Sequence, residues 1–292
     1  MSNLNGLYDE FDSNSAQEYD KEEYSAFKRN EKSKIYEIMD KTSEKVITSG
    51  DDFKEYLDMQ SRFNNYSVGN NLLILAQMPK ATYLRDFNNW TDNGIYIKKF
   101  EKAIKILEPA GEYMREDGSV GINYNVKKMY DISQVSTNKK PRNMKYDEKI
   151  LSKLFLQSSN AVVEIVDKIP NTDRVALYNK SENKLYVARG ENKPTRIYEL
   201  SEELAKQEIN VDSSFDKFKI YCVSYMLCKR YNIDVSNYKF DNIPMELQNL
   251  TAKEIREKLE PMKNAMQNIS TKVDIGVQKI MRENKQQETV RI

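Results

Sequence analysis

Residues 66–82 read YSVGNNLLILAQMPKAT, and this stretch decides how the N-terminal half of the chain is interpreted. From Asn71 to Gln77 it is apolar almost all round, and Pro79 then stops the pattern. A helix that is apolar on every side is normally buried. The stretch therefore predicts a short core helix, with polar side chains at its ends that either hydrogen-bond inside the protein or face a ligand.

Helical and strand patterns flank this core helix on both sides. Upstream, apolar residues recur at intervals of three and four, first from Lys32 to about Gly50 and then in a second helix capped by Asp51 or Asp52. Downstream, alternating apolar residues predict strands, and an Asp-Gly pair predicts a turn between two of them. The expected strands are centred on 96–97, 104–107 and 122–126, with the turn at 117–118.

The C-terminal half is expected to form a second α+β domain. A chain of 292 residues most often holds two domains. A Lys/Pro/Asn-rich linker divides this one. The expected parts are a disordered acidic arm at 1–30, a domain at 31–135, a linker at 136–145, a domain at 146–274 and a flexible tail at 275–292. In the second domain we expect a helix near 150–155, strands at 162–166, 175–178 and 184–187, and helices at 201–209, 215–231 and from 252 onward.

Composition excludes several classes of protein. No apolar run approaches the roughly 18 residues of a membrane span, and the N-terminus lacks a signal pattern, so we expect a cytoplasmic protein with no membrane partner. Cys222 and Cys228 are the only cysteines and are expected to be reduced core residues. The chain contains no histidine, which removes the commonest general base and the commonest metal ligand.

The net charge of +1 hides an uneven distribution of charge along the chain. Residues 1–30 carry three basic and seven acidic side chains, whereas residues 80–145 carry thirteen basic and eight acidic ones. The excess of positive charge in residues 80–145 favours binding of a polyanion such as nucleic acid. The acidic arm is either a solvated tail or a weak competitor for the same basic surface.

Aromatic side chains alternate with cations and amides between Tyr66 and Pro109. Rings that stack on bases at about 1–3 kcal/mol each, beside cations that follow the phosphates, are what a single-strand groove requires. The alternative is that a small domain uses these rings in its core. The residues concerned are Tyr66, Asn70, Asn71, Gln77, Tyr83, Arg85, Phe87, Trp90, Lys98, Lys99, Lys102 and Lys105.

Four segments, in order, resemble the N-terminal domain of ArdC-type antirestriction proteins. They are the run 66–82, Trp90 with Gly94, the lysine-rich 98–109, and the run 129–134 (MYDISQ). One departure concerns the lysine-rich loop, where the family usually has glycines and this chain has Phe100 and Ala103.

The resemblance implies a function for the N-terminal half. In that family the domain binds single-stranded DNA with little sequence preference, and the proteins travel on conjugative plasmids and related elements. We therefore expect single-stranded DNA as the partner, bound by the aromatic, amide and basic residues named above. Strand alternation can place several of Lys98, Lys99, Lys102 and Lys105 on one solvent-facing side.

The same resemblance predicts a zincin-like second domain that has lost its metal site. The family's His-Glu-x-x-His helix corresponds to Glu202-Glu203-Leu204-Ala205-Lys206, and its later Glu ligand falls on Lys219. Zinc at a hydrolytic site takes three protein ligands, typically including His. We expect no catalytic residue, metal or cofactor here, and no enzyme activity. Either the two lysines pair with the glutamates, or the segment is an ordinary surface helix with an i,i+4 pair between Glu202 and Lys206.

Two functions remain from the sequence. The first is a single-strand binder that covers plasmid DNA entering by conjugation, a form of antirestriction that needs no catalysis. The second is a protein-interaction factor whose C-terminal pseudoenzyme domain docks on a host or element protein. A magnesium-dependent nuclease is disfavoured because no compact Asp/Glu motif stands out.

Overall fold

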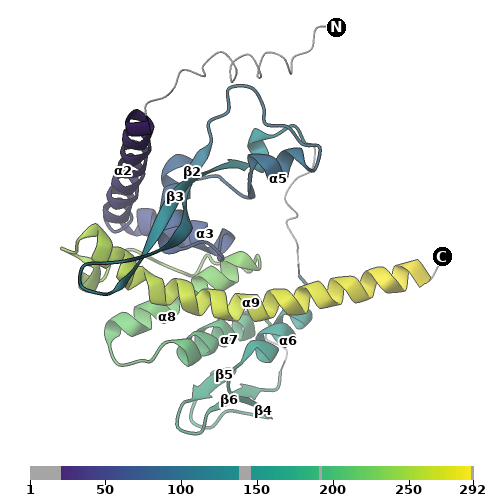
Figure 1. The fold of residues 1–292 in the computed structure, drawn as a ribbon. Coiled ribbons are helices and arrows are strands. Elements are labelled where there is room, and N and C mark those ends of the chain that lie inside the picture. The colour runs from purple at the N-terminus through teal and green to yellow at the C-terminus, as the bar shows by residue number, and fades with distance from the viewer. Residues whose placement is uncertain (1–20, 138–145, 191–192, 291–292) are drawn as a thin grey trace.

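The computed structural model describes residues 21–137, 146–190 and 193–290. At residues 21, 193–194 and 283–290 it describes the backbone alone. It is an α+β fold with two small sheets among helices (Figure 1). None of the described helices is long and apolar enough to cross a membrane. The α-helices are α2 (Lys21–Lys45), α3 (Gly50–Arg62), α4 (Val68–Gln77), α5 (Phe87–Thr91), α6 (Glu148–Ser158), α7 (Lys193–Glu208), α8 (Ser214–Arg230) and α9 (Ala252–Val290). The strands are β1 (Leu84–Asp86), β2 (Ile104–Met114), β3 (Val120–Asp131), β4 (Val162–Val166), β5 (Ala176–Asn179) and β6 (Lys184–Ala188).

The N-terminal half is built on an antiparallel sheet in the order β1-β3-β2. The predicted turn joins β2 to β3, with Gly118 at φ +79°. The predicted core helix is α4, which begins at the N-cap Ser67 and buries Leu72, Leu73 and Ile74 completely. Helix α2 lies beside the β2–β3 hairpin and packs Ile35 and Met39 against it (Figure 1).

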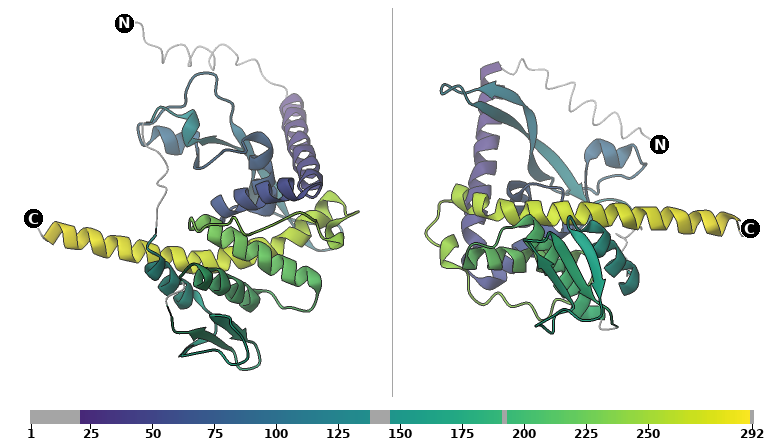
Figure 2. Two further views of the ribbon diagram at one scale, coloured as in Figure 1. Left: turned by 180° about the vertical axis from the view of Figure 1, so that it is seen from behind. Right: turned by 90° about the horizontal axis from the view of Figure 1, so that it is seen from below.

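The C-terminal half carries the second sheet, in the order β4-β6-β5. β4 runs parallel to β6, and β5 runs antiparallel to it. α7 packs on β5 and on its neighbours α6 and α8. The long helix α9 runs across the molecule and contacts α2 and α4 as well as α6 and α8 (Figure 2).

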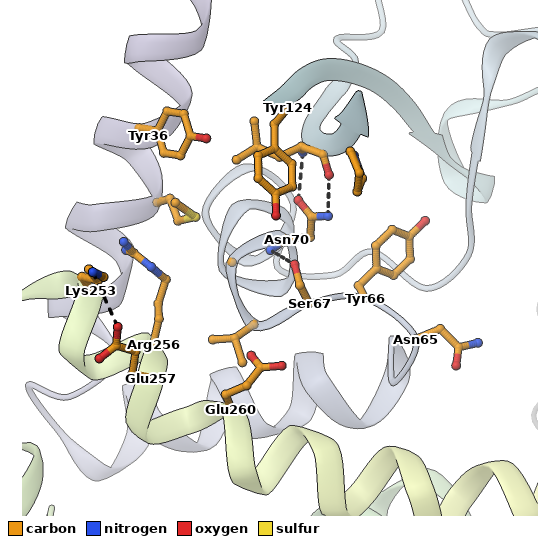
Figure 3. Close-up of a pocket in the computed structure, with 15 residues that line it drawn as sticks. Tyr36, Asn65, Tyr66, Ser67, Asn70, Tyr124, Lys253, Arg256, Glu257 and Glu260 are labelled. Carbon is orange, nitrogen blue, oxygen red and sulfur yellow. Dashed lines mark hydrogen bonds and ion pairs between the residues drawn. The ribbon is translucent and has the colours of Figure 1, made fainter. Parts of the chain in front are cut away.

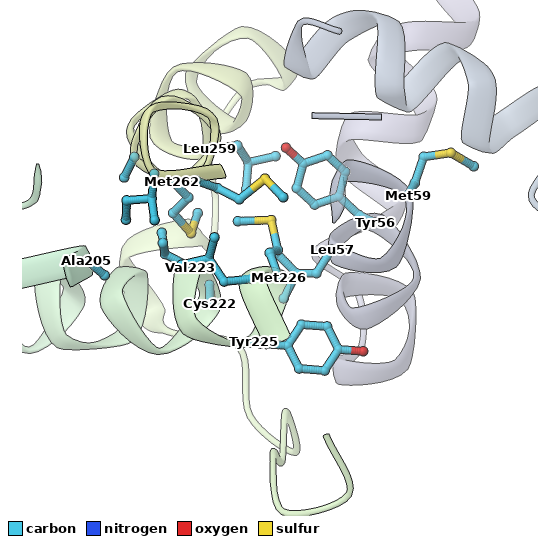
Figure 4. Packing of buried hydrophobic residues seen from close by; sticks show 14 of the residues in the cluster. Tyr56, Leu57, Met59, Ala205, Cys222, Val223, Tyr225, Met226, Leu259 and Met262 are labelled. Carbon is cyan, nitrogen blue, oxygen red and sulfur yellow. The ribbon is translucent and has the colours of Figure 1, made fainter. Parts of the chain in front are cut away.

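One apolar core joins the two halves. Tyr56 and Leu57 of α3 pack with Met226 of α8 and with Leu259 and Met262 of α9, all nearly inaccessible to solvent (Figure 4). The sequence predicted two domains divided at 136–145. Most of that linker, 138–145, lies outside the described residues, and the described parts on either side share this core. Denaturation should therefore disrupt both halves together.

The ends of three elements differ from the predictions. Helix α2 begins at Lys21, so the predicted disorder of 21–30 is wrong, because Lys and Glu favour helix and the segment extends a helix already packed further on. Helix α7 begins at Lys193 and not at 201. The predicted tail is also helical through Val290, with Val277 buried. Gly276 lets α9 approach α6, because a Cβ there would lie 2.4 Å from Leu154.

Two local predictions also need correction. Ser49 caps α3 by accepting a hydrogen bond from the Asp52 N–H, so Asp51 and Asp52 lie inside the first turn. The segment 96–97 forms no strand and contributes only an isolated bridge between Ile97 and Val135.

Candidate nucleic-acid interface

Two amides of α4 seal the free edge of β2. Asn70 donates to the Leu107 carbonyl and accepts from the Leu107 N–H, both at 2.9 Å (Figure 3). Gln77 makes the same pair with Lys105, at 2.8 and 2.9 Å. The two amides are seven residues apart, which is two helical turns, and their targets alternate along the strand. These side chains therefore complete the sheet, in place of the expected contact with nucleic acid.

Asn71 and Tyr66 also belong to the fold. Asn71 is fully buried, and its amide donates to the carbonyls of Phe63, Tyr66 and Ser67, which holds the turn before α4. Tyr66 is half-buried, with its ring edge-on to Phe63 at 5.7 Å between centroids. Neither residue lies on the basic surface described below.

Trp90 is a core residue whose neighbours form an aromatic and cationic stack at the surface. It is 3% exposed, and its indole N–H donates to the Tyr130 carbonyl at 3.0 Å. Tyr83, 39% exposed, lies edge-on to it at 5.8 Å. The Arg85 guanidinium lies over both rings and donates to the Tyr83 hydroxyl at 2.7 Å. The sequence left open whether Trp90 is a core residue or a surface on which bases stack. Trp90 lies in the core, and the accessible ring and cation beside it belong to Tyr83 and Arg85.

The segment 129–134 (MYDISQ) connects the residues around Tyr83 to the loop that carries Lys98, Lys99 and Lys102. The Asp131 carboxylate accepts hydrogen bonds from the backbone N–H groups of Thr82, Tyr83 and Ser133. Burial opposes ionisation of Asp131, but these bonds outweigh it and lower the pKa. The Gln134 amide donates to the Lys102 carbonyl and to the Glu101 carboxylate. The loop that carries Lys102 and the segment that carries Tyr83 are therefore both hydrogen-bonded to residues 131–134.

Three of the four predicted lysines lie in a loop, contrary to the expected strand alternation. Lys98, Lys99 and Lys102 precede β2, which begins at Ile104. Lys98 is anchored by its ammonium to the Ser133 carbonyl at 2.7 Å. Lys105 does lie in β2, where its ammonium is 2.7 Å from a Glu31 oxygen. That hydrogen bond is the main cause of the lowered pKa of Glu31, so Lys105 is already partly neutralised.

Strand register gathers basic and aromatic side chains on one face of the first sheet. Arg85 lies opposite Tyr130, and Lys105 opposite Lys128. Residues directly opposite share a face, as do residues two apart in one strand. Arg85, Tyr130, Lys128 and Lys105 therefore follow one another across the same face, which we call the basic face. Lys128 and Tyr130 were missed, although their alternation in a predicted strand was a usable signal.

A groove of about 870 Å³ opens between the basic face and the N-terminal half of α2. Phe27 and Lys28 come from α2, and Lys102, Lys128 and Tyr130 from the sheet side. Five lysines and two glutamates line it, which leaves an excess of positive charge. Within the described residues, Lys99, Lys102 and Lys128 form no ion pair. These three ammonium groups are available for phosphates.

A second hollow, of about 550 Å³, lies where α2, α4, the hairpin and α9 meet (Figure 3). Tyr36 and Tyr124 contribute rings, and α9 contributes two cations and two carboxylates. Arg256 is engaged by Asp40 at 2.6 Å. Balanced charge and a paired arginine make this hollow less suited to a polyanion than the groove beside the basic face.

The segment that the sequence resemblance matched to a metal-site helix lies in α7, where carboxylates contact backbone and cations. Glu203 is fully buried, and one of its oxygens accepts from the Tyr178 N–H at 2.8 Å. The Arg174 guanidinium lies 3.0 Å from Glu203 and 2.8 Å from Glu202. Burial lowers the pKa of Arg174, but these carboxylates, with Glu199, raise it overall. A guanidinium therefore occupies the space between the carboxylates.

Lys206 and Lys219, which the sequence resemblance matched to lost metal-ligand positions, are both paired. Lys206 lies 2.6 Å from Glu203, as the first alternative expected, and forms no ion pair with Glu202 within the described residues, so the i,i+4 pair of the second alternative is wrong. Lys219 pairs with Asp216 at 2.6 Å and not with either glutamate. The described residues include no group of three His, Cys, Asp or Glu arranged to hold a metal ion. With no histidine in the chain and its carboxylates bonded to Arg174 and Lys206, this site does not fit zinc.

These features define an α+β protein with a basic, aromatic-flanked groove in its N-terminal half and a salt-bridged α7 cluster in its C-terminal half. No family model matches the chain. A curated relative, an uncharacterized protein of Bacillus anthracis, is 33% identical over 103 residues. The match covers 34% of this chain and 18% of that protein.

Two solved structures are similar to the fold. One is the metal-free crystal structure of the antirestriction protein ArdC from the R388 plasmid, at 12% identity and a TM-score of 0.45, covering 72% of this chain and 85% of that one. The other is its Mn(II)-bound form, at 13% identity and a TM-score of 0.42, covering 75% and 90%. Both are of the family that the run 66–82 resembles.

Proposed function

We propose that this protein binds single-stranded DNA in the groove along the basic face. The observation that carries the proposal is the row of Arg85, Tyr130, Lys128 and Lys105, which strand register brings together and of which Tyr130, Lys128 and Lys105 line the groove. Cations of this row neutralise phosphates, while the rings of Tyr83 and Tyr130 offer surfaces to unpaired bases.

The form of the surface favours a single strand over a duplex. Duplex readers place a helix or a two-stranded ribbon in the major groove, and their base contacts need long polar side chains at that element. Here the cations lie in a concave groove beside aromatic rings, the arrangement that suits splayed bases. Sequence tolerance follows, because every base has a face on which a ring can stack.

The test is fluorescence anisotropy with a labelled single-stranded oligonucleotide, titrated across a salt series. A Lys102→Ala/Lys128→Ala variant should bind more weakly and should lower the log–log salt slope by about 1.4, because each phosphate contact on a single strand contributes roughly 0.7. A Lys149→Ala/Lys153→Ala variant is the matched control, since it removes the same charge from exposed positions on α6. It should retain the wild-type slope.

A duplex of the same sequence separates the alternatives. Weaker binding to the duplex supports a single-strand groove. No binding of either nucleic acid at low salt would exclude the proposal and leave the protein-interaction function, in which the C-terminal half docks on a host or element protein.

The biological role we propose follows the family resemblance. A protein that covers single-stranded DNA entering by conjugation shields it from nucleases by occupancy alone, so an antirestriction function needs no catalysis. The pairing of Glu203 with Arg174 and Lys206 supports the matching proposal that the C-terminal half is not a zinc peptidase. Peptide hydrolysis with added zinc that a Glu203→Gln substitution abolishes would contradict it.

A further inference from the structure

Phe100 is the most exposed large apolar side chain in the described part of the chain. Its exposed fraction is 98%, so its ring makes almost no contact with the protein. It also has a positive φ of +67°, the left-handed region that glycine adopts most easily. A phenylalanine here therefore exposes a ring to water and adopts a disfavoured backbone, and neither feature stabilises the fold.

The turn that carries Phe100 is held firmly at both ends. The Glu101 N–H donates to the Lys98 carbonyl across the turn, and the Lys98 N–H donates to the Gln134 carbonyl. On the other side, the Gln134 amide donates to the Lys102 carbonyl at 2.8 Å. A ring on an anchored turn has lost little further backbone freedom when it meets a ligand, which favours binding.

Cations surround the exposed ring in the sequence. Lys98 and Lys99 precede it, Lys102 follows two residues later, and the ammonium groups of Lys99 and Lys102 have no ion-pair partner within the described residues. Lys102 also lines the groove beside the basic face. An exposed ring that is flanked in the sequence by cations supplies the two components of a single-strand contact, a stacking surface and phosphate neutralisation.

We infer that Phe100 stacks on an unpaired nucleobase of the strand bound along the basic face. The inference rests on the proposed single-strand function and adds a contact that neither composition nor strand pattern predicted. Backbone strain at an otherwise unused side chain is consistent with a functional constraint. The ligand group is the flat face of a base of any identity, so the contact adds affinity without sequence preference.

Three substitutions test the inference by anisotropy with single-stranded oligonucleotides. Phe100→Gly relieves the backbone and removes the ring, so its unfolding midpoint should equal or exceed that of the wild type, while affinity falls about 5- to 150-fold, or about 1–3 kcal/mol. Phe100→Leu keeps bulk without an aromatic face and should also lose affinity. Phe100→Trp should retain it.

An abasic oligonucleotide supplies the decisive comparison. It keeps the phosphates and lacks the bases, so Phe100→Gly should bind it as the wild type does. An equal loss on both oligonucleotides, or no loss on either, would overturn the stacking role. If the Lys102→Ala/Lys128→Ala variant is impaired while Phe100→Gly is not, only this inference fails; if neither is impaired, the proposed function itself fails.

Discussion

Replacing the α4 amides should destabilise the protein without altering its nucleic-acid contacts. Asn70→Ala removes two hydrogen bonds to the Leu107 backbone, and Gln77→Ala removes two to Lys105. At about 1 kcal/mol net for each bond, either substitution costs about 2 kcal/mol. The double variant need not be additive, because both amides hold the same strand edge.

Urea unfolding followed by circular dichroism measures the effect. With a slope of about 3 kcal/mol per molar urea, a loss of 2 kcal/mol lowers the midpoint by roughly 0.7 M. Asn88→Ala is the control, since this exposed amide of α5 makes no side-chain hydrogen bond in the described structure, and it should change stability by less than about 0.5 kcal/mol. An Asn70→Ala protein with wild-type stability and impaired DNA binding would refute the reasoning and restore Asn70 to the interface.

Three further predictions concern other parts of the chain. Asp131→Asn should destabilise the protein at neutral pH, and the difference from wild type should shrink as pH falls below about 4 in thermal melts, because a carboxyl with a lowered pKa in the folded state stabilises it only while ionised. Arg174→Ala should cost about 2 kcal/mol in urea unfolding, since it leaves the buried Glu203 with one fewer cation, and an unchanged midpoint would show that the pair is energetically neutral. Burial raises the pKa of the Cys228 thiol to about 11, and burial also raises the pKa of the Cys222 thiol well above its ordinary value, so neither thiol should react with a thiol reagent at pH 8 until the protein unfolds.

The elements with strong periodicity were predictable from the sequence. The all-apolar α4, the long stripe of α9 and the hairpin turn at Asp117–Gly118 lie where the pattern indicated. Element ends were less predictable because packing decides them. Gly276, usually a helix breaker, instead permits α9 to pass close to Leu154, and the helix continues.

Many of the residues of the candidate site could be predicted from the sequence, but their arrangement in space could not. The sequence singled out Arg85, Tyr83 and the lysines, but only the strand register brings Lys128 and Tyr130 beside them. In the sequence, Phe100 differs from the family pattern only by standing where a glycine is usual. The exposure of its ring and its positive φ, on which the stacking inference depends, are properties of the folded loop.

A shared structural device explains why several polar residues looked functional. In each sheet one edge strand is sealed by side chains of a neighbouring helix: Asn70 and Gln77 of α4 bond to β2, and Glu199 and Glu203 of α7 bond to β5. Spacings of seven and four put each pair on one helix face, and an unsealed edge would invite pairing with another chain. Polar residues at such positions are already committed to the fold. Side chains that have no such role are therefore the better candidates for a contact with nucleic acid. Lys128, which is exposed and has no ion-pair partner in the described residues, is one of these.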